Sequence, residues 1–194
     1  SFKTNNLKNM KNIFSYCYSL TSLDISNFDT SHVTDMSEML IDDNRLETLK
    51  IDNFDTSEVS DMSLMFFKCS SLTSLDLKNF NTIRVTKMSS MFQNCEKLKY
   101  LDVSSFDTSH IQDFSGIFSN CYALTSLKIS NFNTDIAKDM SEMFKGCIAL
   151  NDLELFNINT RRVESMHQMF MDCYSLTDIH FNKFNTGNVR DMMN

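Results

Sequence analysis

The amino-acid sequence predicts an α/β solenoid: a right-handed array of 26-residue strand–turn–short-helix repeats with a parallel, concave sheet. Two observations support this. One pattern returns every 26 residues along the whole 194-residue chain. Within each copy, an apolar alternation of period two is followed by an apolar spacing close to the period of a helix. One strand and one short helix cannot bury their apolar faces alone, whereas stacked copies share one core.

The copies follow one another without a gap. The partial copies cover residues 1–19 and 176–194, and the full copies cover residues 20–45, 46–71, 72–97, 98–123, 124–149 and 150–175. We therefore expect a single solenoid domain over residues 1–194, with a stacked column as its core. Both boundaries fall inside a copy, and solenoids need polar capping repeats. We thus expect either a longer array or end-to-end association with other molecules.

Each copy is expected to begin with a short strand. Its fourth and sixth positions are apolar, and a spacing of two places both side chains on one face of a strand. These pairs are Leu23/Ile25, Leu49/Ile51, Leu75/Leu77, Leu101/Val103, Leu127/Ile129, Leu153/Leu155 and Ile179/Phe181. At about 4.8 Å between neighbouring strands, seven of them would form a parallel sheet roughly 30–35 Å long.

The second half of each copy is expected to be a short helix. In the third full copy, Met88, Met91, Phe92 and Cys95 follow the spacing i, i+3, i+4 and i+7, which is one face of a helix. Thr86 stands where an N-cap is expected. The methionines of this segment are interpreted as core residues that fill irregular gaps, rather than as copper ligands.

Charge and hydropathy exclude several classes of partner. Lys and Arg number 18 against 25 Asp and Glu, so the formal net charge is −7. Nucleic-acid binders concentrate positive charge, and DNA or RNA is therefore not an expected partner. The longest apolar runs are far shorter than the 18 or so residues of a spanning helix, so no membrane insertion of this segment is expected. The chain also does not open with a signal peptide.

The sequence predicts neither catalytic residues nor a cofactor, so the chain is not expected to be an enzyme. Three glycines cannot build a glycine-rich phosphate loop. The four histidines, His32, His110, His167 and His180, occupy scattered positions. None of them is placed beside a cysteine, serine or carboxylate in a way that repeats or converges.

A threonine recurs at one position of every copy. The ladder consists of Thr4, Thr30, Thr56, Thr82, Thr108, Thr134, Thr160 and Thr186. We expect these side chains to satisfy backbone groups of the turn after the strand. A calcium ladder is disfavoured, because asparagines interrupt the aspartates that precede the threonines and calcium needs several converging carboxylates.

The cysteines also share one repeat position, on the apolar side of the expected helix. They are Cys17, Cys69, Cys95, Cys121, Cys147 and Cys173, and Asp43 replaces them in one copy. We interpret them as free thiols that act as small core hydrophobes. One thiol per layer cannot assemble a tetrahedral zinc site, and parallel side chains rarely meet the torsion of a disulfide. No metal site is predicted.

Binding residues are sought where the copies differ, because packing fixes the shared positions. The outward third, fifth and seventh strand positions carry varied charges and two aromatic rings. The predicted protein-binding residues of this concave face are Asp24, Lys50, Asp76, Tyr100, Asp102, Lys128, Asp152, Glu154, Phe156 and His180. A merely solvated sheet is an equally weighted alternative. A second patch, Tyr122, Ile148 and Tyr174, either forms a contact or folds against the turn.

The repeated string also carries a family resemblance. The opening L-x-x-L-x-L at this period is the leucine-rich repeat signature. The longer string L-T-S-L-D-[IL]-x-N-F-[DN]-T-x-x-V-x-x-M-S-x-M-F-x-x-C closely resembles the BspA-like leucine-rich repeat, also described as a mycoplasma-type lipoprotein or surface-protein repeat. Phe80 and its equivalents depart from the general leucine-rich repeat, which has Asn or Cys there.

This resemblance implies a location and a role. It implies a non-enzymatic protein of the bacterial cell surface, or a secreted one, with its signal peptide and anchor outside this chain. Adhesion to, or interaction with, a host or bacterial surface protein is the expected function, in the manner of a virulence factor. The alternative is a structural spacer that projects another functional domain from the cell.

Overall fold

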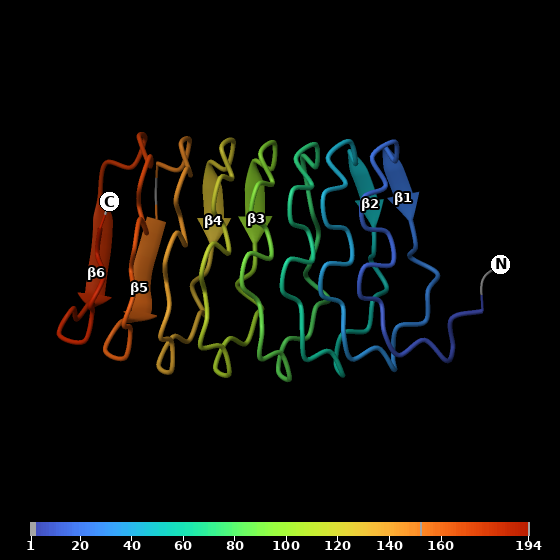
Figure 1. Cartoon of the computed structure of the whole chain (residues 1–194), viewed down its shortest axis with the longest axis horizontal. Helices are drawn as coiled ribbons and strands as arrows, with labels where there is room; N and C mark the ends of the chain where they lie inside the picture. Colours follow the sequence, from blue (N-terminus) through green and yellow to red (C-terminus); the bar gives the residue numbers. More distant parts are fainter. Residues whose placement is uncertain (1–2, 152, 194) are drawn as a thin grey trace.

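The protein folds as a solenoid of stacked coils. The computed structural model describes residues 3–151 and 153–193, and within residues 180–182 it describes the backbone alone. Successive coils lie side by side along one long axis, with the two ends of the chain at opposite ends of the stack (Figure 1). The expected repeat architecture is thus confirmed.

Short parallel strands form along one side of the stack, at the positions that the alternation predicted. They are β1 (Ser22–Asp24), β2 (Thr48–Lys50), β3 (Tyr100–Asp102), β4 (Ser126–Lys128), β5 (Leu153–Asn159) and β6 (Ile179–Lys183). Paired residues face their equivalents 26 positions later, as Leu23 faces Leu49, except that the β5–β6 register shifts after Leu155 and Asn159 faces Lys183. We call the side of the solenoid that bears these strands the strand face.

The expected continuous sheet of seven strands is wrong. The described strands pair only as β1–β2, β3–β4 and β5–β6, and no strand forms around Leu75 and Leu77. In the β1–β2 pair, Asp24 lies opposite Lys50, and the two opposite charges attract each other across the ladder. Asp76 instead pairs with Lys78 of its own copy. No strand forms in this copy, so the ladder is interrupted between β2 and β3.

The β3–β4 pair shows the same charge pattern. Asp102 lies opposite Lys128, and the Nζ–Oδ2 distance is 3.4 Å. Because Lys128 is engaged with Asp102, it does not form an ion pair with Glu154 on the following copy. The ladder breaks a second time there, between β4 and β5.

The expected short helices are also wrong, since the described residues contain none. Each of these segments is a series of tight turns closed by hydrogen bonds such as Met65 N to Met62 O and Cys69 N to Phe66 O. Leu64 and Lys68 have φ angles of 58° and 59°, in the left-handed region that an α-helix cannot use. We call this side of the solenoid the turn face.

Hydrogen bonds on the turn face run between copies instead of along a helix. Leu64 N donates to Ser89 O, Phe66 N to Met91 O, and Lys68 N to Gln93 O, at 2.8–3.0 Å. Turns that repeat every four residues direct inward nearly the same side chains as a helix of period 3.6. The four apolar residues named for the third full copy are accordingly all buried. The spacing identified the buried side chains and misassigned the backbone.

Ladders of identical residues hold the coils together. Phe66, Phe92, Phe118, Phe144 and Phe170 form a column of stacked rings, with centroids 5.6–5.9 Å apart. The threonines act as expected, since the Thr108 hydroxyl donates to Asn133 O at 2.9 Å and accepts from Asn133 N at 2.8 Å. A threonine of this kind thus supplies hydrogen-bond partners to a backbone carbonyl and a backbone amide that the turn leaves unpaired.

The cysteines are free thiols. Cys69, Cys95, Cys121 and Cys147 are buried, and burial raises their pKa above the ordinary value. Each of these sulfurs donates a weak hydrogen bond to a carbonyl of the preceding copy, as Cys95 does to Phe66 O. Cys17 is exposed, contrary to the expected core role, because it lies on the first coil of the stack.

Candidate interaction surface

The structure exposes most of the residues predicted on the strand face. Tyr100 and Phe156 are 45% and 40% exposed, and Asp102 is half-buried. The exposed charged residues are Asp24, Lys50, Asp76, Lys128 and Glu154. Asp152 and the side chain of His180 lie outside the described residues, although the His180 backbone pairs with Glu154 in the β5–β6 ladder.

The first hollow of this face lies between the copy without a strand and β3. It has a volume of about 370 Å³ and is lined in part by Asp76, Lys78, Tyr100, Asp102 and Ser104. Its position coincides with the first break in the parallel ladder. The break therefore brings three predicted residues, Asp76, Tyr100 and Asp102, to the rim of one recess.

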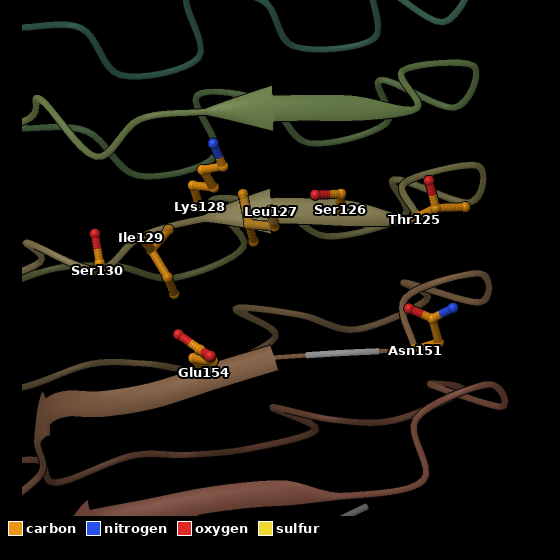
Figure 2. Close-up of a pocket in the computed structure, with 8 residues that line it drawn as sticks. All are labelled: Thr125, Ser126, Leu127, Lys128, Ile129, Ser130, Asn151 and Glu154. Atoms are coloured by element: carbon orange, nitrogen blue, oxygen red, sulfur yellow. The ribbon is translucent and has the colours of Figure 1, made fainter.

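The second hollow lies between β4 and β5, at the other break. It has a volume of about 420 Å³ and is lined in part by Ser126, Lys128, Ser130, Asn151 and Glu154. Figure 2 shows the residues of the β4 segment on one side and Glu154 of β5 on the other. The Lys128 ammonium and the Glu154 carboxylate, which come from neighbouring copies, thus line the same recess.

Hydrogen bonds fix the groups around the first hollow. The Tyr100 hydroxyl donates to Asp102 Oδ2 at 3.0 Å, and the Ser104 hydroxyl donates to Oδ1 at 2.6 Å. The Ser104 hydroxyl and amide, and after them the Tyr100 hydroxyl, lower the pKa of Asp102 to about 2. Lys128 Nζ lies 5.6 Å from the centre of the Tyr100 ring. The ring is held in place before any partner arrives.

Sequence reasoning missed several polar residues of these hollows. Lys78, Ser104, Ser126 and Ser130 occupy outward strand positions like those of the predicted residues, so the repeat offered a signal for them. The breaks in the ladder, which the repeat does not encode, distinguish these positions from their equivalents in other copies.

The second predicted patch divides into two parts. Tyr122 is 40% exposed, and a carbon of its ring lies 3.3 Å from the place that a Gly146 Cβ would occupy, so this ring folds against the next turn. Ile148 and Tyr174 are 38% and 75% exposed, and the Tyr174 hydroxyl donates to Asp172 at 2.7 Å. Folding against the turn therefore accounts for Tyr122 but not for Tyr174.

Groups suited to other chemistry are dispersed. Among residues 3–151 and 153–193, no cluster of three or more His, Cys, Asp or Glu side chains is close enough to hold a metal ion. The same residues include no helix that is long and apolar enough to cross a membrane. The Met193 amide donates to Asp191 Oδ1 at 3.0 Å and lowers the pKa of that carboxyl, and His167 Nδ1, 3.5 Å from the same oxygen, lowers it further.

The family of the chain follows from its repeats. Residues 8–101 and 86–194 match the family described as "Mycoplasma protein of unknown function, DUF285". The chain belongs to the DUF285 family. The resemblance to mycoplasma-type repeats is thereby confirmed. No protein among the curated sequences matches this DUF285 chain.

Solved structures show the fold of the DUF285 chain. It is similar to a leucine rich cell surface protein from Faecalibacterium prausnitzii, with 24% identity and a TM-score of 0.59 over 87% of the chain. The chain spans 40% of the length of that protein. A second solved structure, of a T. pallidum leucine-rich repeat protein, has 15% identity over 73% of this chain and 70% of its own, with a TM-score of 0.36. The fold is that of a leucine-rich repeat protein.

Proposed function

We propose that this DUF285 chain is a non-enzymatic module of the bacterial cell surface whose strand face binds another protein. The observation that carries the proposal is the pair of hollows on that face. Each hollow lies at a break of the ladder, and an exposed aromatic ring stands on an adjoining strand, Tyr100 on β3 and Phe156 on β5. Aromatic anchors surrounded by polar groups are typical of protein interfaces.

The rigidity of the surface supports this proposal. The Tyr100 ring is fixed by Asp102 and Lys128, so binding costs little side-chain entropy there. Phe156 stands on the longest strand, β5, whose Leu155 and Ile158 are buried in the core. A partner would meet two ordered rings set among exposed charges of both signs, which select a complementary partner.

The proposed location and adhesion rest on similarity to surface proteins. The F. prausnitzii structure is described as a cell surface protein, and the sequence resembles surface-protein repeats. We propose the same location for this chain, with a host or bacterial surface protein as partner. End-to-end association of the solenoid is a separate proposal, and light scattering that shows a clean monomer would contradict it.

The strand-face assignment is tested with a triple variant, Asp76→Lys, Tyr100→Ala and Phe156→Ala. Extracellular matrix and cell-surface proteins are first screened for binding to the wild-type chain, and the affinity of each hit is then measured. The triple variant should lose most of that affinity, because it removes both rings and reverses one charge.

A matched control makes the same kinds of change outside both predicted surfaces: Glu96→Lys, Tyr16→Ala and Ile83→Ala, all at exposed residues. The control should bind like the wild type. Unchanged binding by the strand-face variant would overturn the assignment. A screen without any partner would favour the structural spacer instead.

A further inference from the structure

The last three copies, at the C-terminal end of the solenoid (Figure 1), carry five cationic side chains that line two hollows: Lys138 after β4, Arg161 and Arg162 after β5, Lys183 at the end of β6, and Arg190 after β6. Lys138, Arg162 and Arg190 line a hollow of about 420 Å³, and Arg161 and Lys183 line a second one of about 300 Å³, in the same copies. All five are exposed. This cluster lies apart from the hollows of the strand face, and we call it the basic turn cluster.

The basic turn cluster is short of carboxylates. Elsewhere an exposed cation commonly meets a carboxylate of the neighbouring copy, as Arg84 meets Glu58 at 2.6 Å and Lys87 meets Asp61 at 3.0 Å. In the cluster, Arg190 lies 3.8 Å from Glu164. Among the described residues, the other four cations form no ion pair within 4 Å.

The acidic groups that face the cluster do not neutralise it. Glu164 lines the first hollow, and Asp135 lies beside the second, where it accepts a hydrogen bond from Asn159. The linings of the two hollows thus hold five cations and one carboxylate, in a chain whose net charge is −7. An excess of positive charge in these linings would attract anions.

Packing does not require these arginines. The positions of Arg161 and Arg162 hold Ser31 and His32 in the first full copy, and Gly187 and Asn188 in the last copy. The Arg161 amide donates to Asn159 Oδ1. Ser57 makes the same bond to Asp55, so the turn needs the backbone of this position and not its side chain.

The surroundings of the cations indicate the class of ligand. Guanidinium groups bind sulfate and carboxylate in a bidentate manner, and the side-chain amides of Asn185 and Asn188 can meet hydroxyl groups. Phe184, which lines the second hollow, packs against the core. The cluster thus offers neither an apolar anchor for a protein nor an exposed ring for base stacking.

We infer that the basic turn cluster binds a linear polysaccharide that carries sulfate or carboxylate groups. The cations come from three successive copies, so they extend over about 10 Å along the stack, at about 4.8 Å per copy. A chain with repeated anionic groups would contact several of them at once, and one small anion would contact few. The inference does not depend on the strand-face proposal.

The test measures binding of a fluorescent heparin oligosaccharide to the full chain by anisotropy, at low and at physiological ionic strength. The double variant Arg161→Ser, Arg162→Asn carries residues that other copies hold at these positions, so it should fold. Its affinity for heparin should fall roughly tenfold, with a shallower dependence on salt. Uncharged dextran should not bind to either protein.

The matched control is Lys97→Ser, Lys99→Thr, which removes the same two charges at exposed lysines outside the cluster. It should bind heparin like the wild type. Equal weakening in both variants would show attraction by net charge alone and would overturn the inference. It would also be overturned by tighter binding to an oligonucleotide or to vesicles of anionic phospholipid than to heparin.

Discussion

The turn face and the strand face of this solenoid are built from the same number of copies but differ in continuity. On the turn face, stacked phenylalanines and hydrogen bonds between copies run almost from end to end. On the strand face, the ladder is broken into three two-stranded pieces. The turn face, whose residues repeat from copy to copy, thus holds the coils together. The hollows lie on the strand face, whose outward residues vary between copies.

This difference separates stability from recognition. Residues that repeat in every copy pack against their own equivalents, so a change in one disturbs two neighbours. Residues of the strand face mostly meet solvent or one cross-strand partner, and exposed pairs contribute little to stability. We therefore expect substitutions to lower the free energy of unfolding more on the turn face than at the outward positions of the strand face.

The largest effect is expected from Phe92→Ala. Phe92 is fully buried and stacks between Phe66 and Phe118, so the truncation leaves a cavity on both sides. The free energy of unfolding should fall by about 3–5 kcal/mol, measured by urea denaturation. Leu75→Ala, at a half-buried residue of the strand face, is the control and should cost less than half as much. Equal costs would contradict the proposed division between the faces.

A second large effect concerns Asp43, which interrupts the cysteine ladder. Asp43 is fully buried, Oδ1 accepts a 2.7 Å hydrogen bond from Cys17 N, and Oδ2 has no partner among the described residues. Burial raises the pKa of Asp43 from 3.8 to about 6. The folded state therefore keeps its proton at pH values where the unfolded state has lost it.

The sign of the pH effect follows from that shift. The stability of the wild type should rise as the pH falls from above 6 towards 4, by at most roughly 3 kcal/mol for this group. Asp43→Cys restores the cysteine of the ladder and removes the titrating carboxyl, so its stability should not show this rise at low pH. The free energies of unfolding of the two proteins, measured by urea denaturation, should therefore differ most near neutral pH. Parallel pH profiles for the two proteins would show that Asp43 does not titrate in this range.

The smallest effect is expected on the strand face. Lys128→Ala removes an exposed ion pair with Asp102 and the contact of the ammonium with the Tyr100 ring. This variant should lower the free energy of unfolding less than Leu75→Ala does, because both contacts of Lys128 are exposed to solvent. Lys50→Ala removes the equivalent pair with Asp24, also at 3.4 Å, and should cost less still, because no contact of Lys50 with an aromatic ring is seen. A larger loss in the Lys50 variant would contradict the stabilising role of the ring.

Particular residues show how far the sequence could predict the fold. The 26-residue period gave the solenoid, the strand positions and the buried side chains, and the threonine ladder behaves as expected. The same period could not distinguish a helix from tandem turns. Met88, Met91, Phe92 and Cys95 point inward in either conformation, because turns of four residues and a helix of 3.6 residues nearly coincide over two turns.

The candidate site was only partly predictable. The variable outward positions gave Asp76, Tyr100 and Glu154, and the structure places each of them at a hollow. The basic turn cluster was not foreseen, since its five cations occupy four repeat positions in three copies and come together only when the coils stack.

The sequence by itself determined the repeat, its register and the side chains that fill the core, because periodic burial requires a periodic pattern of apolar residues. The tertiary structure alone decided where the backbone forms turns instead of helices and where the parallel ladder breaks. Those outcomes depend on which carbonyl accepts each amide proton and which neighbour each charge meets. Both are relations between copies, and neither is visible within one copy.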